Sequence, residues 1–257
     1  MVKAKKHLGQ HFLTDKNIAQ KIVNALSPEQ QNILEIGPGM GVLTQLILSN
    51  PDKKLIALDV DKESVAYLQQ HFPENKDQFL LQDFLKADLS QFFQSPFAVI
   101  GNFPYNISSQ ILFKVLENRS RVPELVGMYQ KEVAERIASK PGNKVYGILS
   151  VLAQAFYDTE YLFTVHEHVF SPAPKVKSAV IKMKRKPELN PGCDEALFFK
   201  VVKGGFNQRR KTLRNSLKRV HPQLTPEIPF LDKRPEQLSV KDFILLTSAI
   251  EKIPKQA

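Results

Sequence analysis

Short apolar runs alternate with amphipathic segments over the first part of the chain. The apolar runs predict buried strands at Asn32–Ile36, Lys54–Leu58, Phe79–Gln82, Phe97–Ile100 and Leu125–Tyr129. Apolar residues at helical spacing predict helices at Val42–Ser49, Lys62–His71, Ser108–Glu117, Lys131–Ser139 and Tyr146–Phe156. This alternation is typical of an α/β fold, in which helices cover both faces of a mostly parallel sheet.

The pattern then changes. Thr159–His166 and Lys177–Lys184 alternate apolar and polar residues, which predicts two more strands that close the sheet in antiparallel orientation. Residues 185–193 are rich in Pro and Gly, as linkers are, and the sequence beyond them is helical with proline breaks. We therefore expect a catalytic domain at residues 1–185 and a small, basic α-helical domain at residues 186–257.

Composition limits the class of protein. The chain has 257 residues, of which 42% are hydrophobic, which is enough for a substantial core. The apolar runs are shorter than the roughly 20 residues that span a bilayer. The single cysteine, Cys193, excludes an intrachain disulfide and a multi-cysteine metal site, and it fits a reducing cytoplasm. We expect a cytoplasmic protein that needs no metal.

The charge is unevenly distributed along the chain. The net charge is +10, which favours a polyanionic partner, although a basic surface without such a partner is the alternative. One stretch carries eight basic residues and no acidic one: Lys200, Lys203, Arg209, Arg210, Lys211, Arg214, Lys218 and Arg219. A solvated helix face usually mixes both signs, so this stretch predicts contacts with nucleic-acid phosphates.

A glycine loop follows the first predicted strand, at Glu35-Ile36-Gly37-Pro38-Gly39-Met40-Gly41. Gly37 and Gly39 let the chain turn sharply and approach a ligand closely. The spacing is G-x-G-x-G, which differs from the G-x-G-x-x-G of dinucleotide-binding proteins. The loop therefore predicts a nucleotide-like cofactor other than NAD.

Acidic residues end the next two predicted strands. Asp59 lies where a carboxylate can accept hydrogen bonds from both ribose hydroxyls, and Asp83 can accept from an adenine amine with Phe84 beside the ring. The alternative for each aspartate is capping of the helix that follows. Together with the glycines, and without a phosphate-binding lysine, the two residues predict a nucleoside cradle that suits S-adenosylmethionine better than ATP.

The tetrapeptide Asn102-Phe103-Pro104-Tyr105 follows the fourth predicted strand. Open α/β sheets bind ligands at this end of their strands. The Asn102 amide oxygen and a backbone carbonyl can accept from an exocyclic amine, and the Tyr105 ring can cover the face of a base. The alternative is an ordinary Asn-Pro turn after a strand.

These motifs occur in the order found in adenine N6-methyltransferases, and three further segments narrow the resemblance. Lys6–Leu13, Phe170–Val176 and Gly205–Leu217 are similar to segments of the KsgA (RsmA) family of ribosomal RNA adenine dimethyltransferases. The resemblance covers essentially the whole chain. Gly205–Leu217 is its most specific part, because the Erm resistance methyltransferases share the catalytic core but are not expected to carry that basic run.

The resemblance implies a Rossmann-like class I S-adenosylmethionine-dependent methyltransferase. It implies dimethylation at N6 of two adjacent adenosines in a hairpin loop near the 3′ end of 16S rRNA, on a small-subunit precursor and as part of ribosome biogenesis. We expect a monomer. The cofactor residues carried over from the family are His11, Leu13, Gly37, Asp59, Asp83 and Asn102.

The chain departs from the family pattern at two positions. His11 stands where asparagine is frequent, and Phe103 stands where leucine or isoleucine is usual. The bulkier Phe103 ring is expected to reshape the adenine pocket, while its carbonyl can still accept a hydrogen bond.

Adenine N6 is a poor nucleophile because its lone pair is delocalised into the ring. We hypothesise that Asn102 Oδ1 and the Phe103 carbonyl accept the N6 hydrogens, that Pro104 keeps the turn rigid, and that Tyr105 and Phe170 stack on the base. The RNA contacts are expected from Arg209, Arg210, Lys211 and Arg214, and also from Lys3, Lys5 and Lys6 near the N-terminus.

Three alternative functions stay open at this point. The first is an Erm-like methyltransferase that acts on 23S rRNA. The second is an RNA-binding assembly factor that keeps the fold without catalysis, although such a protein needs neither the acidic pair nor the tetrapeptide. The third is a DNA adenine methyltransferase, which the basic segment alone does not exclude.

Overall fold

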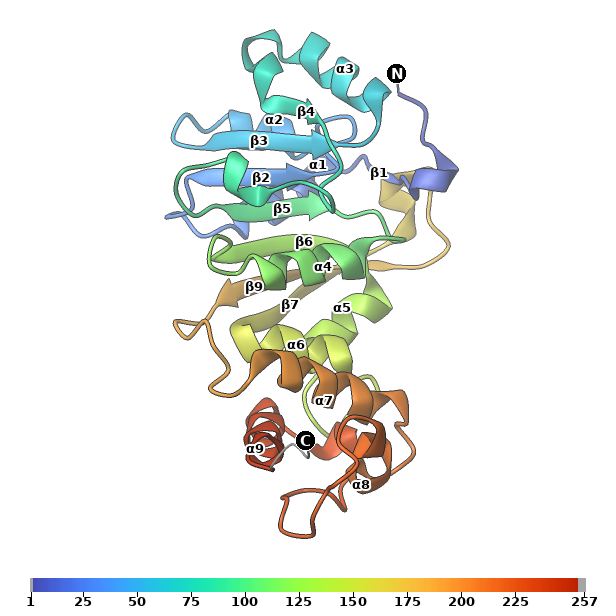
Figure 1. Ribbon diagram of the computed structural model, residues 1–257. Helices are drawn as coiled ribbons and strands as arrows, with labels where there is room; N and C mark the ends of the chain where they lie inside the picture. Colours follow the sequence, from blue (N-terminus) through green and yellow to red (C-terminus); the bar gives the residue numbers. More distant parts are fainter. Residues whose placement is uncertain (1, 254–257) are drawn as a thin grey trace. The chain divides into compact units, whose positions relative to one another are not determined.

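The computed structural model describes residues 2–253. The chain forms two compact units. Figure 1 draws the helices and strands of both, coloured along the sequence. The first unit runs up to residue 134 and includes Thr159–Arg185. The second comprises Glu135–Asp158 and the residues from Lys186 onward.

The first unit is built on a seven-stranded sheet with the order β4-β3-β2-β5-β6-β9-β7 (Figure 1). The strands are β2 (Asn32–Ile36), β3 (Lys54–Asp59), β4 (Phe79–Leu81), β5 (Ala98–Asn102), β6 (Glu124–Gln130), β7 (Tyr157–Val165) and β9 (Ser178–Arg185). β4, β3, β2, β5 and β6 pair in parallel, and β9 pairs antiparallel to β6. The predicted α/β fold with a mostly parallel sheet is confirmed.

The helices between the strands follow the predicted rhythm. They are α2 (Thr44–Leu48), α3 (Lys62–His71), α4 (Ser108–Glu117) and α5 (Lys131–Ala138). A further helix, α1 (Lys16–Asn24), has no counterpart among the predicted elements. Asp15 caps α1 by accepting from the N–H groups of Asn17 and Ile18, at 2.8 and 3.0 Å.

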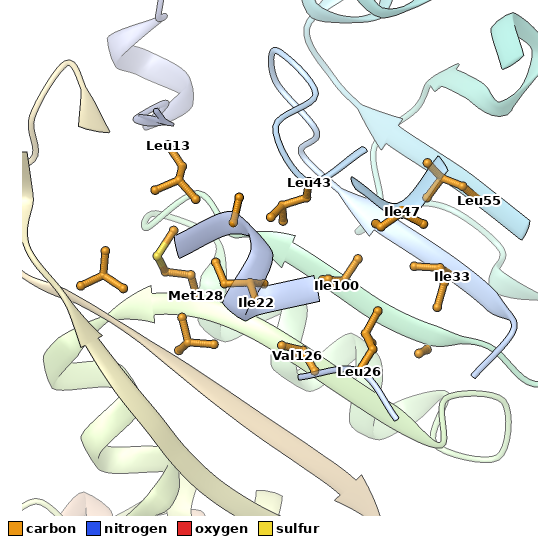
Figure 2. Packing of buried hydrophobic residues seen from close by; sticks show 14 of the residues in the cluster. Leu13, Ile22, Leu26, Ile33, Leu43, Ile47, Leu55, Ile100, Val126 and Met128 are labelled. Atoms are coloured by element: carbon orange, nitrogen blue, oxygen red, sulfur yellow. The ribbon is translucent and has the colours of Figure 1, made fainter. Parts of the chain in front are cut away.

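One cluster of core residues lies between the sheet and the helices α1 and α2. Branched aliphatic side chains from β2, β5 and β6 interlock with Ile22 of α1 and Ile47 of α2 (Figure 2). Ile33, Ile100 and Val126 are fully buried in this cluster. Close packing of this kind makes the sheet a rigid support for the loops that follow its strands.

The order of the strands determines where a ligand can bind. From β2 the chain proceeds outward through β3 and β4, and it then returns to the other side of β2 as β5. The strand order therefore reverses between β2 and β5, and the loops at the carboxyl ends of these two strands lead away from each other and leave a crevice between them. The glycine loop follows β2, and the tetrapeptide begins with the last residue of β5.

A second, two-stranded sheet brings the N-terminal segment to this crevice. β1 (Phe12–Leu13) pairs antiparallel with β8 (Phe170–Ser171), and Thr14 N donates to the Val169 carbonyl at 2.9 Å. This pairing joins parts of the chain that are more than 150 residues apart in sequence.

The second unit is helical. α6 (Ile148–Phe156) packs against α7 (Glu195–Asn207) and α9 (Val240–Glu251), and the short α8 (Leu213–Ser216) lies against α7. This division differs from the expected domains, because residues 135–158 group with the C-terminal segment and not with the sheet. The physical reason is the composition of α6, whose sequence is mostly apolar and which buries residues on several sides against its helical neighbours.

Cys193 belongs to this unit and is a half-buried free thiol. Burial, together with nearby carboxylates, raises its pKa to about 11, so the thiol is protonated at neutral pH and is a poor nucleophile. Among residues 2–253, His, Cys, Asp and Glu do not gather in a group of three that fits a metal ion. Within the same residues the helices are too short or too polar to cross a membrane.

Candidate functional site

A cavity of about 320 Å³ lies at the carboxyl edge of the sheet in the first unit. Its walls come from the N-terminal segment Leu8–Phe12, the glycine loop, the turns after β3 and β4, and Asn102–Ile107. The predicted residues His11, Gly37, Gly39, Asp59, Asp83 and Asn102–Tyr105 therefore share one cavity.

The glycine loop adopts backbone conformations that favour glycine. Gly37 and Gly39 have φ angles of 66° and 56°. A Cβ on Gly39 would also lie only 2.8 Å from the Phe12 ring. The loop thus fits closely under the N-terminal segment, and a larger residue at Gly39 would separate the two.

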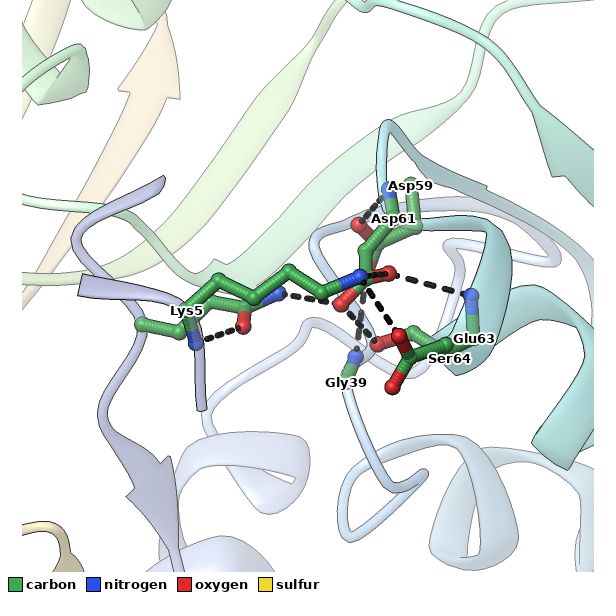
Figure 3. A network of polar contacts seen from close by, with 7 residues as sticks. Lys5, Gly39, Asp59, Asp61, Glu63 and Ser64 are labelled. Carbon is green, nitrogen blue, oxygen red and sulfur yellow. Dashed lines mark hydrogen bonds and ion pairs between the residues drawn. The ribbon is translucent and has the colours of Figure 1, made fainter. Parts of the chain in front are cut away.

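Asp59 holds the loop from the next strand. It is buried, and its carboxylate accepts from Gly39 N at 3.3 Å and from Asp61 N at 2.9 Å (Figure 3). Burial raises the pKa of the Asp59 carboxyl, and the two backbone N–H groups oppose that rise. The carboxylate still borders the cavity, where it can accept from a ligand hydroxyl.

Asp83 lines the cavity and also stabilises the turn after β4. Its Oδ1 accepts from Leu85 N at 2.9 Å, and the exposed Lys86 approaches it at 3.9 Å. The neighbouring Phe84 is buried and does not line the cavity, where Leu85 stands instead. Phe84 was expected beside the adenine ring, but its side chain is buried in the core.

Asn102 lies at the end of β5 with its amide fixed in orientation. Its Nδ2 donates to the His11 carbonyl at 2.8 Å, which leaves Oδ1 as the group available to a hydrogen-bond donor. Phe103 N donates to the Met128 carbonyl at 3.2 Å, so the backbone of the tetrapeptide is tied to β6.

The Phe103 ring lies in the core and does not reshape the pocket as expected. It is 1% exposed and meets Tyr129 edge-on, with ring centroids 5.1 Å apart. Gly101 and Gly127 make room for the ring, since a Cβ on Gly127 would lie 2.2 Å from Phe103 Cε2. The departure from the usual aliphatic residue is thus accommodated inside the protein.

A second cavity, of about 490 Å³, adjoins the first and shares Gly9, Gln10, His11 and Tyr105 with it. Tyr105 is held by a 2.6 Å hydrogen bond between its hydroxyl and Ser178 Oγ. The His11 ring lies 5.4 Å from the Tyr105 ring, and its Nδ1 is 2.8 Å from the Pro172 carbonyl. The side chain of His11 therefore forms part of the wall of the second cavity, while its backbone carbonyl accepts the hydrogen bond from Asn102 Nδ2.

The remainder of the second cavity comes from the N-terminal segment and from the loop after β8. Pro172–Val176 and Gln130 line it, together with Ala4, Lys6, Gly9 and Gln10. The lining combines apolar side chains with the exposed lysines Lys6 and Lys175, and it contains no acidic residue among those described. Such a surface suits a base with a phosphate nearby.

Two predicted site residues belong to the core. Phe170 is 5% exposed and pairs with Leu13 across the β1–β8 sheet, so its ring is not free to stack on a base. Leu13 is 4% exposed and borders a recess of about 20 Å³ beneath the glycine loop. The strand pairing turns both side chains inward, away from the two cavities.

Three polar residues near the cofactor cavity were not predicted as site residues. Glu35, in β2, is fully buried, and it accepts from Thr44 Oγ1 at 2.7 Å. Burial raises its pKa to about 8, with a smaller contribution from the nearby Asp59. Gln10 and Asp61 contact each other across the cavity edge. In the sequence, Glu35 is an acidic residue within a predicted buried strand, and this was the signal that could have marked it as a site residue.

The predicted RNA-binding residues divide into two pairs in the second unit. Arg209 donates to the Tyr146 carbonyl at 2.8 Å and lies over the Phe206 ring, and Arg214 contacts Asp232 at 3.4 Å. Arg210 and Lys211 are exposed. The first pair has contacts within the protein, whereas the second pair is presented to solvent.

The first cavity, of about 320 Å³, fits an adenosine-like, positively charged cofactor. The described residues that line it include two carboxylates and neither lysine nor arginine, which disfavours a triphosphate. The sheet order, the glycine loop and the acidic strand ends together define a class I methyltransferase dependent on S-adenosylmethionine. The sequence model of the ribosomal RNA adenine dimethylases matches residues 1–245, so the chain belongs to that family.

Curated relatives support the same assignment. The chain is 60% identical to a ribosomal RNA small subunit methyltransferase A of Cytophaga hutchinsonii, over 97% of this chain and 98% of the relative. It is 59% identical to a protein with the same description from Flavobacterium johnsoniae, over 97% of each.

Solved structures agree on the fold. A dimethyladenosine transferase from Plasmodium falciparum superposes with a TM-score of 0.76 at 25% identity, over 92% of this chain and 96% of the other. The 23S rRNA methyltransferase ErmE gives a TM-score of 0.67 at 24% identity, over 94% and 100% of the two chains, which shows a shared fold.

Proposed function

We propose that this enzyme dimethylates N6 of two adjacent adenosines in a hairpin loop near the 3′ end of 16S rRNA, within a small-subunit precursor in the cytoplasm. The relatives described as small subunit methyltransferases support the choice of substrate. The position of Asn102 carries the chemistry, because its amide is anchored by Nδ2 and faces the cofactor cavity beside Tyr105.

The residues of the first cavity would hold S-adenosylmethionine. Asp59 would accept from ribose hydroxyls and Asp83 from the adenine amine, and the glycine loop allows close approach of the backbone. The two carboxylates favour a cationic ligand. When bound, this cofactor supplies an electrophilic methyl group.

The tetrapeptide would orient the acceptor. Asn102 Oδ1 and the Phe103 carbonyl would each accept a hydrogen from adenine N6, which pulls the nitrogen toward tetrahedral geometry and directs its lone pair. Orientation and fixed dipoles of this kind account for large parts of enzymatic rate enhancements. A monomethylated amine keeps one N–H, so one of the two acceptors suffices for the second methylation.

The second cavity would receive the extruded base and its strand. Tyr105 offers a ring to the base, and stacking contributes about 1–3 kcal/mol per base against an extrusion cost of a few kcal/mol. Lys6 and Lys175 border this cavity and would meet phosphates of the same strand. Arg210 and Lys211 of the second unit would supply further phosphate contacts.

The test is transfer of a radiolabelled methyl group to small ribosomal subunits that lack the modification, followed by nucleoside analysis. We expect N6,N6-dimethyladenosine in 16S rRNA. Dimethylation of 23S rRNA instead would indicate an Erm-like activity, and binding to small subunits without transfer would indicate a non-catalytic assembly factor. A matched reaction on DNA tests the remaining alternative. The monomeric state stays a prediction, which light scattering of the purified protein can check.

A further inference from the structure

The N-terminal segment, residues 5–12, forms one wall of the cofactor cavity. Leu8–Phe12 line the cavity, and Phe12 lies against Gly39 of the glycine loop. At one end the segment continues into β1, whose pairing with β8 fixes its position. At the other end Lys5 contacts Asp61, in the turn between β3 and α3.

Asp61 collects hydrogen bonds from both sides of the cavity edge. Its side chain is fully buried, and it accepts from Lys5 Nζ at 2.5 Å and from Gln10 Nε2 at 3.0 Å. It also accepts from Glu63 N at 3.0 Å and from Ser64 Oγ at 3.4 Å (Figure 3). Two of these donors belong to the N-terminal segment and two to the start of α3.

Gln10 completes the contact within the segment. Its Oε1 accepts from Lys5 N at 2.8 Å while its Nε2 donates to Asp61, so both ends of the amide are used. The ammonium group of Lys5 contacts Glu63 as well, at 3.1 Å. Lys5 is thus engaged by carboxylates at the start of α3, whereas Lys6 is exposed.

The same aspartate connects to the cofactor-binding groups. Asp61 N donates to Asp59 Oδ1, and Asp59 Oδ2 accepts from Gly39 N. A continuous series of hydrogen bonds therefore runs from Lys5 through Asp61 and Asp59 to the glycine loop (Figure 3). Asp61 itself does not line the cavity.

We propose that Asp61 is a positioning residue that latches residues 5–12 over the cofactor and thereby controls how long the cofactor stays bound. The segment is a wall of the cavity, so opening that wall requires Lys5 and Gln10 to leave the Asp61 side chain. Asp61 is buried while Lys5 is partly exposed, and a buried carboxylate that loses its cationic partner is unfavourable. The proposal rests on the assignment of this cavity to S-adenosylmethionine.

Asp61 also caps α3, and this structural role must be separated from the latch. The variant K5M removes the charge from the segment and leaves the cap and every group that lines the cavity in place. Lys16, exposed at the start of α1, gives the matched control K16M. D61N removes the charge from the other partner but keeps acceptor and donor groups near the helix terminus.

We expect K5M to dissociate S-adenosylhomocysteine about tenfold faster than wild type in stopped-flow experiments on the full chain, and to raise the KM for S-adenosylmethionine by a similar factor. Its kcat at saturating cofactor should fall by less than about threefold. Amide hydrogen exchange at residues 6–12 should accelerate in the bound state. D61N and the double variant K5M/D61N should release S-adenosylhomocysteine at about the same rate as K5M, because all three proteins lack the ion pair between positions 5 and 61.

Cofactor dissociation and exchange at residues 6–12 that match wild type in K5M would overturn the latch, as would an equal effect of K16M. A kcat that falls as much as KM rises would show that Lys5 acts in transfer and not in cofactor retention. Failure of the wild-type protein to bind S-adenosylhomocysteine would instead refute the assignment of the cavity, and this outcome is distinct from the others.

Discussion

The cofactor cavity and the basic segment at residues 209–214 were both predicted from side-chain chemistry, but the structure treats their residues differently. In the cavity, polar residues at or just after the ends of three strands lie together and face one space. In the basic segment, Arg209 and Arg214 contact their own unit, while Arg210 and Lys211 are exposed. The carboxyl ends of parallel strands lie at one edge of the sheet, so residues there can be predicted to share a site. A series of basic residues gives no indication of which side chains make contacts within the fold and which are free for RNA.

The largest effect should come from the cavity. Asn102→Ala removes the oriented amide oxygen, and we expect single-turnover methyl transfer to fall by about 10²–10³-fold, as when one preorganised polar group is lost from an active site. Asn24→Ala, at the exposed end of α1, is the control and should transfer at the wild-type rate. Near wild-type transfer by a folded Asn102→Ala protein would remove Asn102 from the mechanism.

Glu35, the buried carboxyl near the cofactor cavity, should make the free energy of unfolding decrease as the pH rises. Its folded pKa of about 8 lies above the ordinary value of 4.5, so between these values the unfolded chain loses a proton that the folded protein keeps. Stability contributed by this group is therefore highest below pH 4.5, declines up to about pH 8 and is then constant. Glu35→Gln should abolish this decline and raise the free energy of unfolding near pH 8 by on the order of 2–4 kcal/mol.

Urea unfolding at several pH values measures this difference. The exposed Glu74→Gln variant should keep the wild-type dependence on pH. An equally steep decline in Glu35→Gln would show that another group is responsible.

The basic segment can be divided by two matched variants. Arg209→Ala should lower the free energy of unfolding by about 1–2 kcal/mol, because it leaves the Tyr146 carbonyl and the partly buried Glu236 without their cationic partner. Arg210→Ala should leave stability unchanged and weaken RNA binding severalfold, with a salt dependence shallower by about one phosphate contact. Thermal unfolding and binding titrations at several salt concentrations check both. If the two variants behave alike, the contrast between the pairs is wrong.

The smallest effect on activity should come from Phe103→Leu. The ring fills space in the core, so its truncation should cost about 1–2 kcal/mol of stability. Methyl transfer should change by less than about twofold, because the backbone carbonyl remains. Denaturant unfolding and the ratio of mono- to dimethyladenosine are the measurements. A large change in that ratio at unchanged stability would place the ring in the acceptor pocket after all.

The sequence predicted best what depends on local pattern. The strands β2 to β6 and the helices α3 and α4 follow directly from apolar spacing, and residues at strand ends share a cavity because parallel strands end at one edge. Leu13, Phe84 and Phe170 were placed in the site by sequence motif, yet their side chains point into the core. On a two-residue strand or a tight turn, the direction of a side chain depends on long-range pairing that spacing does not reveal.

Domain membership was hard to predict for the same reason. Residues 135–158 continue the βα rhythm in sequence, but α6 is apolar on several sides and needs α7 and α9 as partners. The bond between Lys5 and Asp61 joins residues with no shared motif, so it appears only once the fold is known.

The packing of Phe103 against Gly127 constrains how such a protein can change over generations. A methyl group at position 127 would overlap the Phe103 ring, so Gly127→Ala is disfavoured while phenylalanine is present. That methyl group would also lie 2.9 Å from the Tyr129 ring, so a smaller residue at 103 and a shift of Tyr129 would both have to come first. In a reverse history, glycine at 127 would have to precede phenylalanine at 103. The two sites should therefore substitute in a fixed order, and relatives that carry phenylalanine with a larger residue at 127 should be rare.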